Sequence, residues 1–291
     1  MFRTESLFSR RQFLRTGSAA GLGLMAARFL RADDPKDGFG EFTVGAQSYT
    51  FRNFNLEQCL KRTQDLGLKH IEFYNGHVKT SSTPDQINAV KKMCSEYGIA
   101  PVAFGVEHFS KNHDANKKLF EFGKELGIKH LSADPDPDSF DNLDKLVDEF
   151  KIAIAIHPHG PSGKQLHRWY SAERIMNAVR NHHQLIGSCL DTGHLIRCAQ
   201  PPFSERLDPA QQVRHMGARN FGMHLKDHDN QKRTDVVFGR GALDVPAVLR
   251  ALRDVKFSGY IAIEYEANPD NPGPDIQACL EVFRNAVAKL K

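Results

Sequence analysis

Eight short apolar runs alternate with longer amphipathic segments along residues 40–291, and this alternation restricts the fold more than any other feature of the chain. Short apolar runs are typical of buried strands, whereas apolar residues at a spacing of three and four are typical of helices. Strands that alternate with helices need crossover connections, which produce a parallel sheet. The predicted strands are 42–51, 70–74, 100–106, 130–133, 152–156, 185–190, 221–225 and 260–265.

The segments between these runs carry helix signals. Thr83 and Asp244 are typical N-terminal caps, and Gly67 and Gly98 each end a helical segment. Eight strand–helix units are the number that closes a barrel, and a doubly wound sheet would usually carry a glycine-rich turn after its first strand, which residues 48–52 are not. The sequence therefore predicts an α/β fold, a single (β/α)8 TIM barrel over residues 40–291. The predicted helices are 56–66, 83–97, 115–126, 140–151, 171–183, 209–219, 245–255 and 275–290.

Residues 1–32 resemble a bacterial export signal. A basic segment with the pair Arg10-Arg11 precedes Phe13 and Leu14, a glycine- and alanine-rich apolar run follows, and Ala32 is a candidate cleavage site. Paired arginines in this position resemble the twin-arginine type. We therefore expect residues 1–32 to engage the twin-arginine export machinery, residues 33–39 to form a short linker, and the mature protein to be periplasmic.

The charge distribution limits the partners of the barrel. The chain carries a net charge of +4, but six arginines against Glu5 give residues 1–32 a charge of +5, so the remainder carries −1. A body without basic excess is not expected to bind nucleic acid or an anionic membrane. No run of about 20 uncharged apolar residues is present, so we expect no stable membrane insertion. The five cysteines contain no C-x-x-C pair and are predicted to be buried free thiols.

Residues capable of metal binding or proton transfer collect at the ends of the predicted strands. Four consecutive strands end in such residues: the fifth in His157 and His159, the sixth in Asp191, the seventh in His224 and the eighth in Glu264. A polar side chain inside a buried strand is costly unless it is paired or binds a ligand. Because the active sites of such barrels lie at the carboxyl ends of the strands, we expect these side chains to form one site.

Imidazole and carboxylate ligands together suit one divalent metal ion (Mn, Zn, Co, Mg or Fe). Asp191, His224 and Glu264, with a histidine of the fifth strand, would provide four ligands. We expect His159 to be the fourth ligand and His157 to act as acid or base, although either histidine could fill the metal position. The remaining candidates for substrate contact or proton relay are Glu72, His194 and Lys226.

Several motifs in this order resemble the xylose-isomerase-like barrels, also called the sugar phosphate isomerase/epimerase superfamily. They are Ile71-Glu72, Cys189-Leu-Asp191-Thr-Gly-His194, His224-Leu-Lys226-Asp227, Gly239-Arg-Gly241 and Ile263-Glu264-Tyr-Glu266. The resemblance implies that Asp191, His224 and Glu264 bind the metal. It also implies a sugar or polyol substrate, from which a proton next to a carbonyl is removed through an enediolate.

One position departs from the family pattern. Epimerases of this family usually present a glutamate on the fifth strand that is both ligand and base, and here that position is His157. Imidazole preserves metal binding but not a symmetric exchange between two glutamates. The main prediction is therefore a metal-dependent isomerase or epimerase. The alternatives are a lyase or dehydratase acting on a keto-sugar or keto-inositol, and a non-catalytic exported sugar-binding barrel.

The superfamily also contains abasic-site endonucleases that need additional ligands. After Asp227 this chain has His228, Asp229 and Asp235 without the later Asp-x-His of those enzymes, which argues against DNA repair. The expected partner is a small sugar or polyol, and a homo-oligomer is compatible with the resemblance. Residues 161–170, which contain the only tryptophan, are equally consistent with substrate contacts and with an ordinary surface loop.

Overall fold

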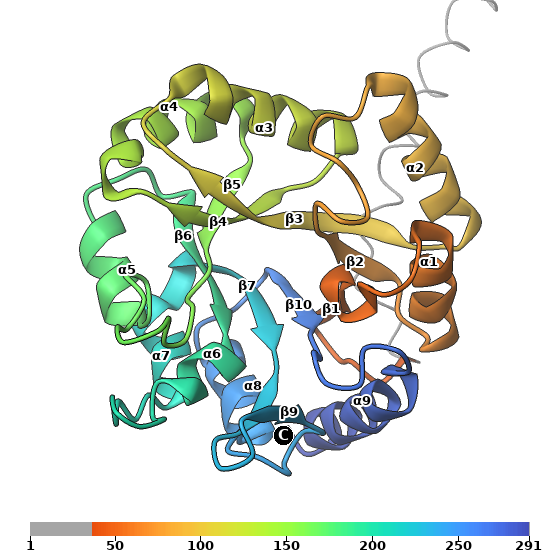
Figure 1. The fold of residues 1–291 in the computed structure, drawn as a ribbon, viewed down its shortest axis with the longest axis vertical. Coiled ribbons are helices and arrows are strands. Elements are labelled where there is room, and N and C mark those ends of the chain that lie inside the picture. Colours follow the sequence, from red (N-terminus) through yellow and green to blue (C-terminus); the bar gives the residue numbers. More distant parts are fainter. Residues whose placement is uncertain (1–36, 291) are drawn as a thin grey trace, which may run out of the picture.

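Eight parallel strands close into a barrel, with helices packed around the outside (Figure 1). The computed structural model describes residues 37–290, so the predicted export signal and most of the predicted linker lie outside the described residues. Around the barrel the strand order is β1–β10–β7–β6–β5–β4–β3–β2, which confirms the predicted (β/α)8 TIM barrel. The barrel strands are β1 Thr43–Gln47, β2 His70–Phe73, β3 Ala100–Phe109, β4 His130–Pro135, β5 Ala153–Ile156, β6 Ile186–Asp191, β7 Asn220–Leu225 and β10 Tyr260–Ile263.

The helices begin where the sequence offers capping side chains. Thr83 accepts a hydrogen bond from Gln86 N at the start of α2, and Asp244 accepts one from Ala247 N at the start of α8, so both predicted caps are confirmed. The helices are α1 Leu56–Asp65, α2 Pro84–Glu96, α3 His113–Leu126, α4 Phe140–Phe150, α5 Ala172–Val179, α6 Thr192–Arg197, α7 Pro209–Met216, α8 Val245–Asp254 and α9 Gly273–Ala288.

Three local features differ from the prediction. The first strand ends at Gln47 instead of residue 51, because the Gln47 side chain accepts a hydrogen bond from Tyr49 N and starts a 3-10 turn, Ser48–Phe51. The short helix α6 was not predicted and begins directly after β6. A two-stranded antiparallel hairpin, β8 Asp227–Asp229 with β9 Thr234–Val236, was also not predicted, since three-residue strands leave little periodicity to detect.

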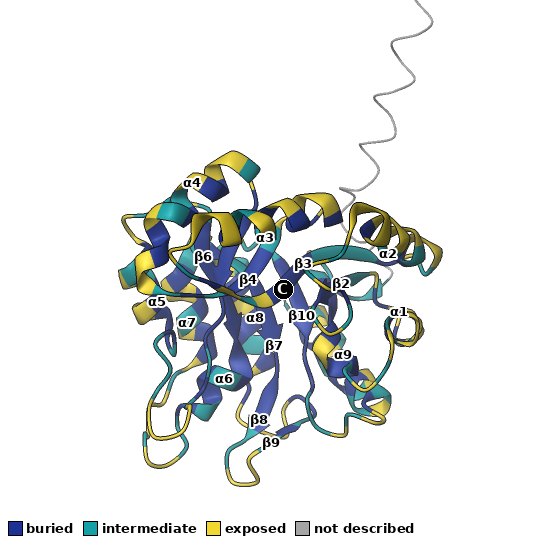
Figure 2. Cartoon of the chain, turned by 45° about the horizontal axis from the view of Figure 1, so that its top comes forward, coloured by how far each residue is buried: buried dark blue, intermediate teal, exposed yellow. Residues whose placement is uncertain are grey.

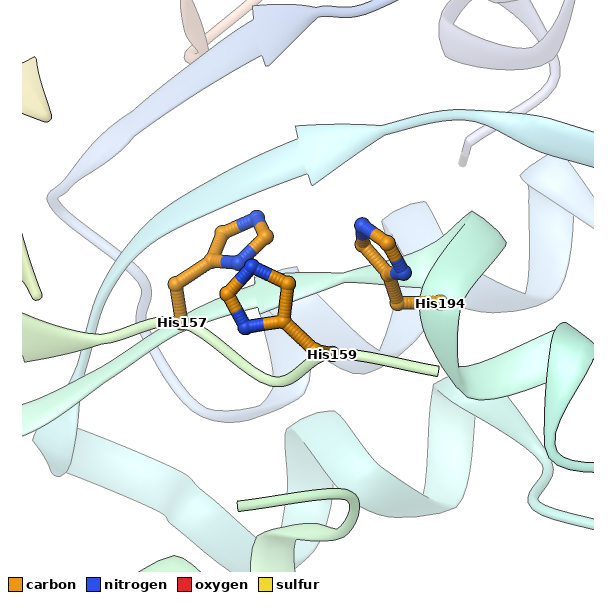
Figure 3. A group of neighbouring side chains, drawn as sticks. All are labelled: His157, His159 and His194. Carbon is orange, nitrogen blue, oxygen red and sulfur yellow. The ribbon is translucent and has the colours of Figure 1, made fainter. Parts of the chain in front are cut away.

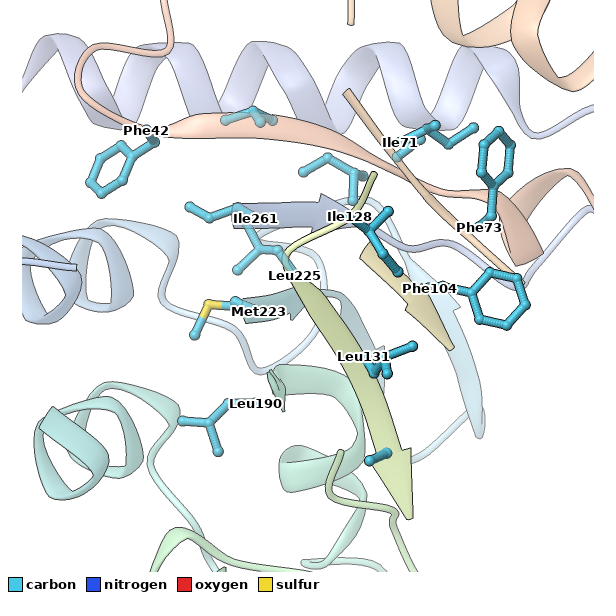
Figure 4. Packing of buried hydrophobic residues seen from close by; sticks show 14 of the residues in the cluster. Phe42, Ile71, Phe73, Phe104, Ile128, Leu131, Leu190, Met223, Leu225 and Ile261 are labelled. Carbon is cyan, nitrogen blue, oxygen red and sulfur yellow. The ribbon is translucent and has the colours of Figure 1, made fainter. Parts of the chain in front are cut away.

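The main hydrophobic core lies between the barrel and the helices. Phe104, Leu131 and Ile261 are fully buried there, and Figure 4 shows these and other side chains of the barrel strands that belong to this core. Apart from β3, the barrel strands are mostly buried, whereas the helices expose their outer faces (Figure 2). This arrangement leaves the carboxyl ends of the strands as the place where polar side chains gather.

The interior of the barrel has a separate, smaller core. It consists mostly of small side chains around one large ring, Tyr260, which is 2% exposed. The five cysteines are buried free thiols, as predicted. Among residues 37–290, no helix combines the length and apolar character needed to cross a membrane. The members of the interior core are Ala103, Ala155, Cys189, Tyr260 and Ala262.

Candidate metal centre

Four buried side chains meet at the carboxyl ends of neighbouring strands. Asp191, at the end of β6, is paired in register with His224 on β7, and His224 lies beside Ala262, two residues before Glu264. His157 directly follows β5. All four are buried, with Asp191 fully inaccessible and Glu264, the most exposed, at 7%. Adjacent parallel strands thus deliver four potential ligands to one point, as the sequence predicted for three of them.

The spacing of the four donor atoms matches the edges of a metal coordination shell. His157 Nε2 lies 3.0 Å from His224 Nδ1 and 3.4 Å from Asp191 Oδ2. His224 Nδ1 lies 2.9 Å from Glu264 Oε2 and 3.8 Å from Asp191 Oδ2. Ligands about 2.1 Å from a common ion lie about 3.0–3.4 Å from one another. The same four atoms therefore surround a position that fits one divalent ion.

Two of these atoms make no hydrogen bond in the described residues, although both lie within ion-pair distance of Lys226 Nζ. Asp191 Oδ2 and Glu264 Oε2 are buried and accept no hydrogen bond of acceptable geometry from residues 37–290. The other oxygen of Asp191 accepts from His194 N at 2.7 Å and caps α6, which fixes the orientation of the carboxylate. Buried carboxylate oxygens without partners are costly unless a cation binds them. The residues present therefore fit a divalent ion.

Glu72 orients His224. His224 Nε2 donates to Glu72 Oε2 at 2.7 Å, so the hydrogen at Nε2 is engaged and Nδ1 faces the other ligands. A carboxylate that holds the distal nitrogen of a metal-binding histidine is a recurring support for such sites. We expected Glu72 among the substrate-contacting or proton-relay residues. The structure instead places it behind His224, with no exposed surface and both oxygens hydrogen-bonded.

Lys226 supplies positive charge to the carboxylates. Its Nζ lies 3.3 Å from Asp191 Oδ2, 3.5 Å from Glu264 Oε2 and 2.6 Å from Glu266 Oε1, and the residue is 1% exposed. Burial alone would lower the pKa of Lys226, but Asp191, Glu264 and Glu266 raise it well above its ordinary value. Gly193 makes this position possible, because a Cβ there would lie 2.7 Å from Lys226 Cγ.

Protonation of His224 competes with metal binding. Burial lowers the pKa of His224, but Cys189 and the carboxylates of Glu72 and Glu264 raise it more, so it lies well above its ordinary value. The pKa of Asp191 is well below its ordinary value, because Lys226 and the neighbouring histidines outweigh the effect of burial. A metal ion bound at His224 Nδ1 would displace a proton, so its binding would weaken as the pH falls.

The two histidines that follow β5 occupy different positions. His157 belongs to the four-residue group, whereas His159 lies beside His157 and His194 in a second group (Figure 3). Their ring centroids lie 4.8 Å (His157–His159) and 5.1 Å (His159–His194) apart. His159 Nδ1 is buried without a hydrogen-bond partner among the described residues, and burial lowers the pKa of His159 to about 3. The geometry thus favours His157 for the metal position in which we expected His159.

His194 presents an N–H group next to these rings. Its Nδ1 accepts from Gly160 N at 2.9 Å and lies 3.3 Å from Arg197 Nη1, so in the neutral ring the hydrogen is on Nε2. Burial is the main reason that the pKa of His194 lies well below its ordinary value, and the ring is therefore neutral at pH 7. His194 is thus a fixed hydrogen-bond donor beside the metal centre.

Residues 161–170 pack against the end of β4. Arg168 forms ion pairs with Asp134 Oδ1 at 3.1 Å and Asp136 Oδ1 at 2.6 Å. Trp169 is 4% exposed and donates from Nε1 to Pro135 O at 3.0 Å. Trp169 therefore anchors the loop against the end of β4.

Asp227, which follows Lys226, organises the next loop. Its two oxygens accept from the backbone N–H groups of five residues at 2.8–2.9 Å, and the side chain is 1% exposed. A Cβ at Gly241 would lie 2.4 Å from Asp227 Oδ1, which explains the glycine there. The sequence motif Gly239-Arg-Gly241 marks this loop, but the motif does not indicate that the loop backbone binds Asp227. The donors are His228, Gly239, Gly241, Ala242 and Leu243.

Solved structures of similar fold include named sugar epimerases. A putative uncharacterized protein from Parabacteroides distasonis is 25% identical, with a TM-score of 0.65 over 84% of this chain and 98% of that one. A D-psicose 3-epimerase from Clostridium cellulolyticum is 14% identical, with a TM-score of 0.66 over 84% and 99%. A 3-keto-D-glucoside 4-epimerase from E. coli is 15% identical, with a TM-score of 0.63 over 84% and 99%.

Sequence comparison places most of the chain in one family. No curated protein matches this chain. The family model described as xylose isomerase-like TIM barrel matches residues 60–286, which include the ends of all strands that carry the candidate ligands. The closed barrel agrees with that match. The chain belongs to the xylose isomerase-like TIM barrel family.

Proposed function

We propose that this protein is a divalent-metal-dependent isomerase or epimerase that removes a proton next to the carbonyl of a small sugar or polyol. The observation that carries the proposal is the set of four buried donor groups at the carboxyl ends of β5, β6, β7 and β10, whose ligand atoms all lie within 4.8 Å of one another. The names of the neighbouring epimerases support the reaction class. A sugar-binding barrel without activity would have no need of this ligand set.

We assign His157, Asp191, His224 and Glu264 as the metal ligands. His157 takes the place we expected for His159, because only His157 reaches the other three atoms. His159, whose Nδ1 has no partner among the described residues, is left free to exchange a proton with the substrate. The two histidines thus exchange the roles that the sequence suggested.

The chain's own groups would share the proton transfer. A bound divalent ion would supply Lewis acidity to the substrate carbonyl. The ligand set contains two carboxylates, Asp191 and Glu264. We assign Glu264, which directly follows β10, as the general base. His194, with its hydrogen fixed on Nε2, donates a hydrogen bond to a substrate oxygen as negative charge develops. Lys226 helps to hold the pKa of Asp191 well below its ordinary value and lies 3.5 Å from Glu264 Oε2.

A lyase acting on a keto-sugar is the second candidate, and one observation favours it. The fifth-strand position carries imidazole instead of the carboxylate that a symmetric two-carboxylate exchange requires. A single carboxylate base with neutral imidazoles nearby suits removal of one proton followed by loss of a leaving group from the adjacent carbon. The two candidates share the first step and differ in the product.

Solvent exchange tests the shared step. The purified protein, loaded with Mn²⁺, is incubated in D₂O with a panel of ketoses and 3-keto-glucosides, and the products are followed by NMR. We expect deuterium at the carbon next to the carbonyl, with loss of exchange after chelation and recovery on adding metal. An epimer identifies the first candidate and an unsaturated ketone the second. Absence of exchange from every substrate, by protein shown to hold metal, would contradict the proposal.

We also propose that residues 1–32 direct export through the twin-arginine machinery to the periplasm. The proposal is supported by the Arg10-Arg11 pair before the apolar run. Cell fractionation of a bacterial host that expresses the full chain tests it. We expect the native chain in the periplasm and the Arg10→Lys/Arg11→Lys variant in the cytoplasm, and equal distribution of the two would contradict export by this route.

A further inference from the structure

A chain of polar side chains crosses the interior of the barrel behind His224. His224 Nε2 lies 2.7 Å from Glu72 Oε2, and Glu72 Oε1 accepts from Ser132 Oγ at 2.5 Å. Ser132 Oγ lies 3.0 Å from the hydroxyl of Tyr260, which lies 3.5 Å from Cys189 Sγ. None of these five residues is more than 2% exposed. These five side chains come from β7, β2, β4, β10 and β6 in turn.

Burying this series of polar side chains in the barrel interior costs free energy. The neighbouring interior positions are alanines, such as Ala103 and Ala155, so the barrel does not need polar groups to fill this space. A buried carboxylate loses its hydration, and each oxygen must recover a hydrogen bond from the protein. Glu72 obtains one from His224 and one from Ser132, and these two donors together fix the plane of its carboxylate.

We propose that Ser132 and Tyr260 are positioning residues, which hold Glu72 so that His224 keeps its Nε2 hydrogen engaged and its Nδ1 directed at the metal position. The inference rests on the proposed metal centre and extends it to β4, which contributes no ligand. Groups that orient a metal-binding histidine from behind typically change metal affinity by about 10- to 100-fold when they are removed. Ser132 donates to the carboxylate at 2.5 Å. Tyr260 contacts Ser132 at 3.0 Å and contributes less than Ser132 at Glu72 itself, so its effect should be the smaller one.

Ser188 provides a matched control within the same barrel. It is fully buried on β6, and its hydroxyl donates to Asn220 Oδ1 at 2.9 Å, outside the chain described above. Ser132→Ala and Ser188→Ala therefore remove the same atom from equally buried positions. Only Ser132→Ala leaves the Glu72 carboxylate short of a donor.

The experiment measures Mn²⁺ and Co²⁺ affinity of the full chain by competition with a chelator. We expect Ser132→Ala to weaken binding about 10- to 100-fold, Tyr260→Phe to weaken it less, and Ser188→Ala to bind like the native protein. The visible spectrum of the Co²⁺ form should change in Ser132→Ala and not in Ser188→Ala. Should Ser132→Ala fail to fold, Tyr260→Phe, which keeps the ring in place, decides the question.

Nitrogen-15 NMR of histidine-labelled, metal-free protein gives a reading that does not depend on bound metal. We expect the His224 Nε2 resonance of a protonated, hydrogen-bonded nitrogen in the native protein and an altered one in Ser132→Ala. Native affinity and spectra in both variants would overturn the positioning role and leave the proposed function intact. Failure of the native protein to bind either ion would overturn both.

Discussion

The two ends of the barrel interior differ in how their polar groups are paired. Toward the amino ends of the strands, small side chains such as Ala103 and Ala262 surround the ring of Tyr260, and its hydroxyl is hydrogen-bonded to Ser132. Toward the carboxyl ends, Asp191 and Glu264 bury carboxylate oxygens that accept no hydrogen bond of acceptable geometry from the described residues. One end is a packed core, and the other buries carboxylate oxygens that a proposed metal ion would bind.

The difference shows where the fold gives up stability for function. A buried charge without a partner costs several kcal/mol, which a folded protein tolerates only where something else binds. Lys226 offsets part of that cost, but it pairs with three carboxylates at once. The carboxyl end is therefore the region where a cation should contribute most to folding as well as to chemistry.

The largest expected effect comes from substitution of Glu264, the proposed base at the carboxyl ends of the strands. Glu264→Gln removes a ligand charge and the proposed base together, so we expect metal retention to be lost. Turnover should fall at least about 10³-fold, since Lewis-acid stabilisation is worth several kcal/mol. Metal analysis and the D₂O exchange assay measure both. Glu107→Gln, half-buried on β3 and outside the ligand set, is the control. A metal-free Gln variant with full activity would refute the assignment.

A comparison of two histidines sharpens the position of the centre. We expect His157→Ala to weaken metal binding at least about 100-fold, more than loss of an outer partner does. His159→Ala should keep the metal and lower turnover, because His159 lies outside the four-residue group. Chelator competition together with kcat separates the two effects. The opposite pattern would restore His159 as the ligand.

Asp227 and Asp229 test how the cost of changing a carboxylate depends on its burial and on the number of its backbone donors. Because five backbone N–H groups converge on Asp227, Asp227→Asn should cost about 3 kcal/mol of unfolding free energy without loss of metal binding. Hydrogen exchange should rise at residues 239–243. Asp229→Asn, on the same hairpin with two backbone donors, should cost clearly less unfolding free energy than Asp227→Asn. Equal costs for the two variants would contradict this account.

The smallest expected effect lies at the core end of the interior. Half-buried His130 packs against Tyr260, and burial lowers the pKa of His130 from 6.5 to about 4. The folded state therefore takes up the proton less readily than the unfolded chain. The stability that depends on neutral His130 is fully present above pH 6.5 and is lost as the pH falls toward 4. We expect native stability to fall by about 1 kcal/mol more than that of His130→Gln between pH 7 and pH 5. Urea unfolding at both pH values measures this, and parallel pH profiles would contradict it.

The fold and most of the candidate site were predictable because both depend on periodicity. Alternation along each strand identified the inward-facing Asp191, His224 and Glu264 before any coordinates. The same rule could not separate His157 from His159, since β5 ends at Ile156 and alternation does not extend into the following loop. The support of His224 by Glu72 depends on a contact across the barrel between residues 152 positions apart, for which the sequence holds no local signal.

The central claim is that one divalent ion lies among four specific atoms. Anomalous diffraction from crystals of the mature protein grown with Mn²⁺ tests it most directly. The account predicts one strong peak about 2.0–2.2 Å from His157 Nε2, Asp191 Oδ2, His224 Nδ1 and Glu264 Oε2. A peak held by His159 in place of His157, or no peak among these atoms, would contradict it.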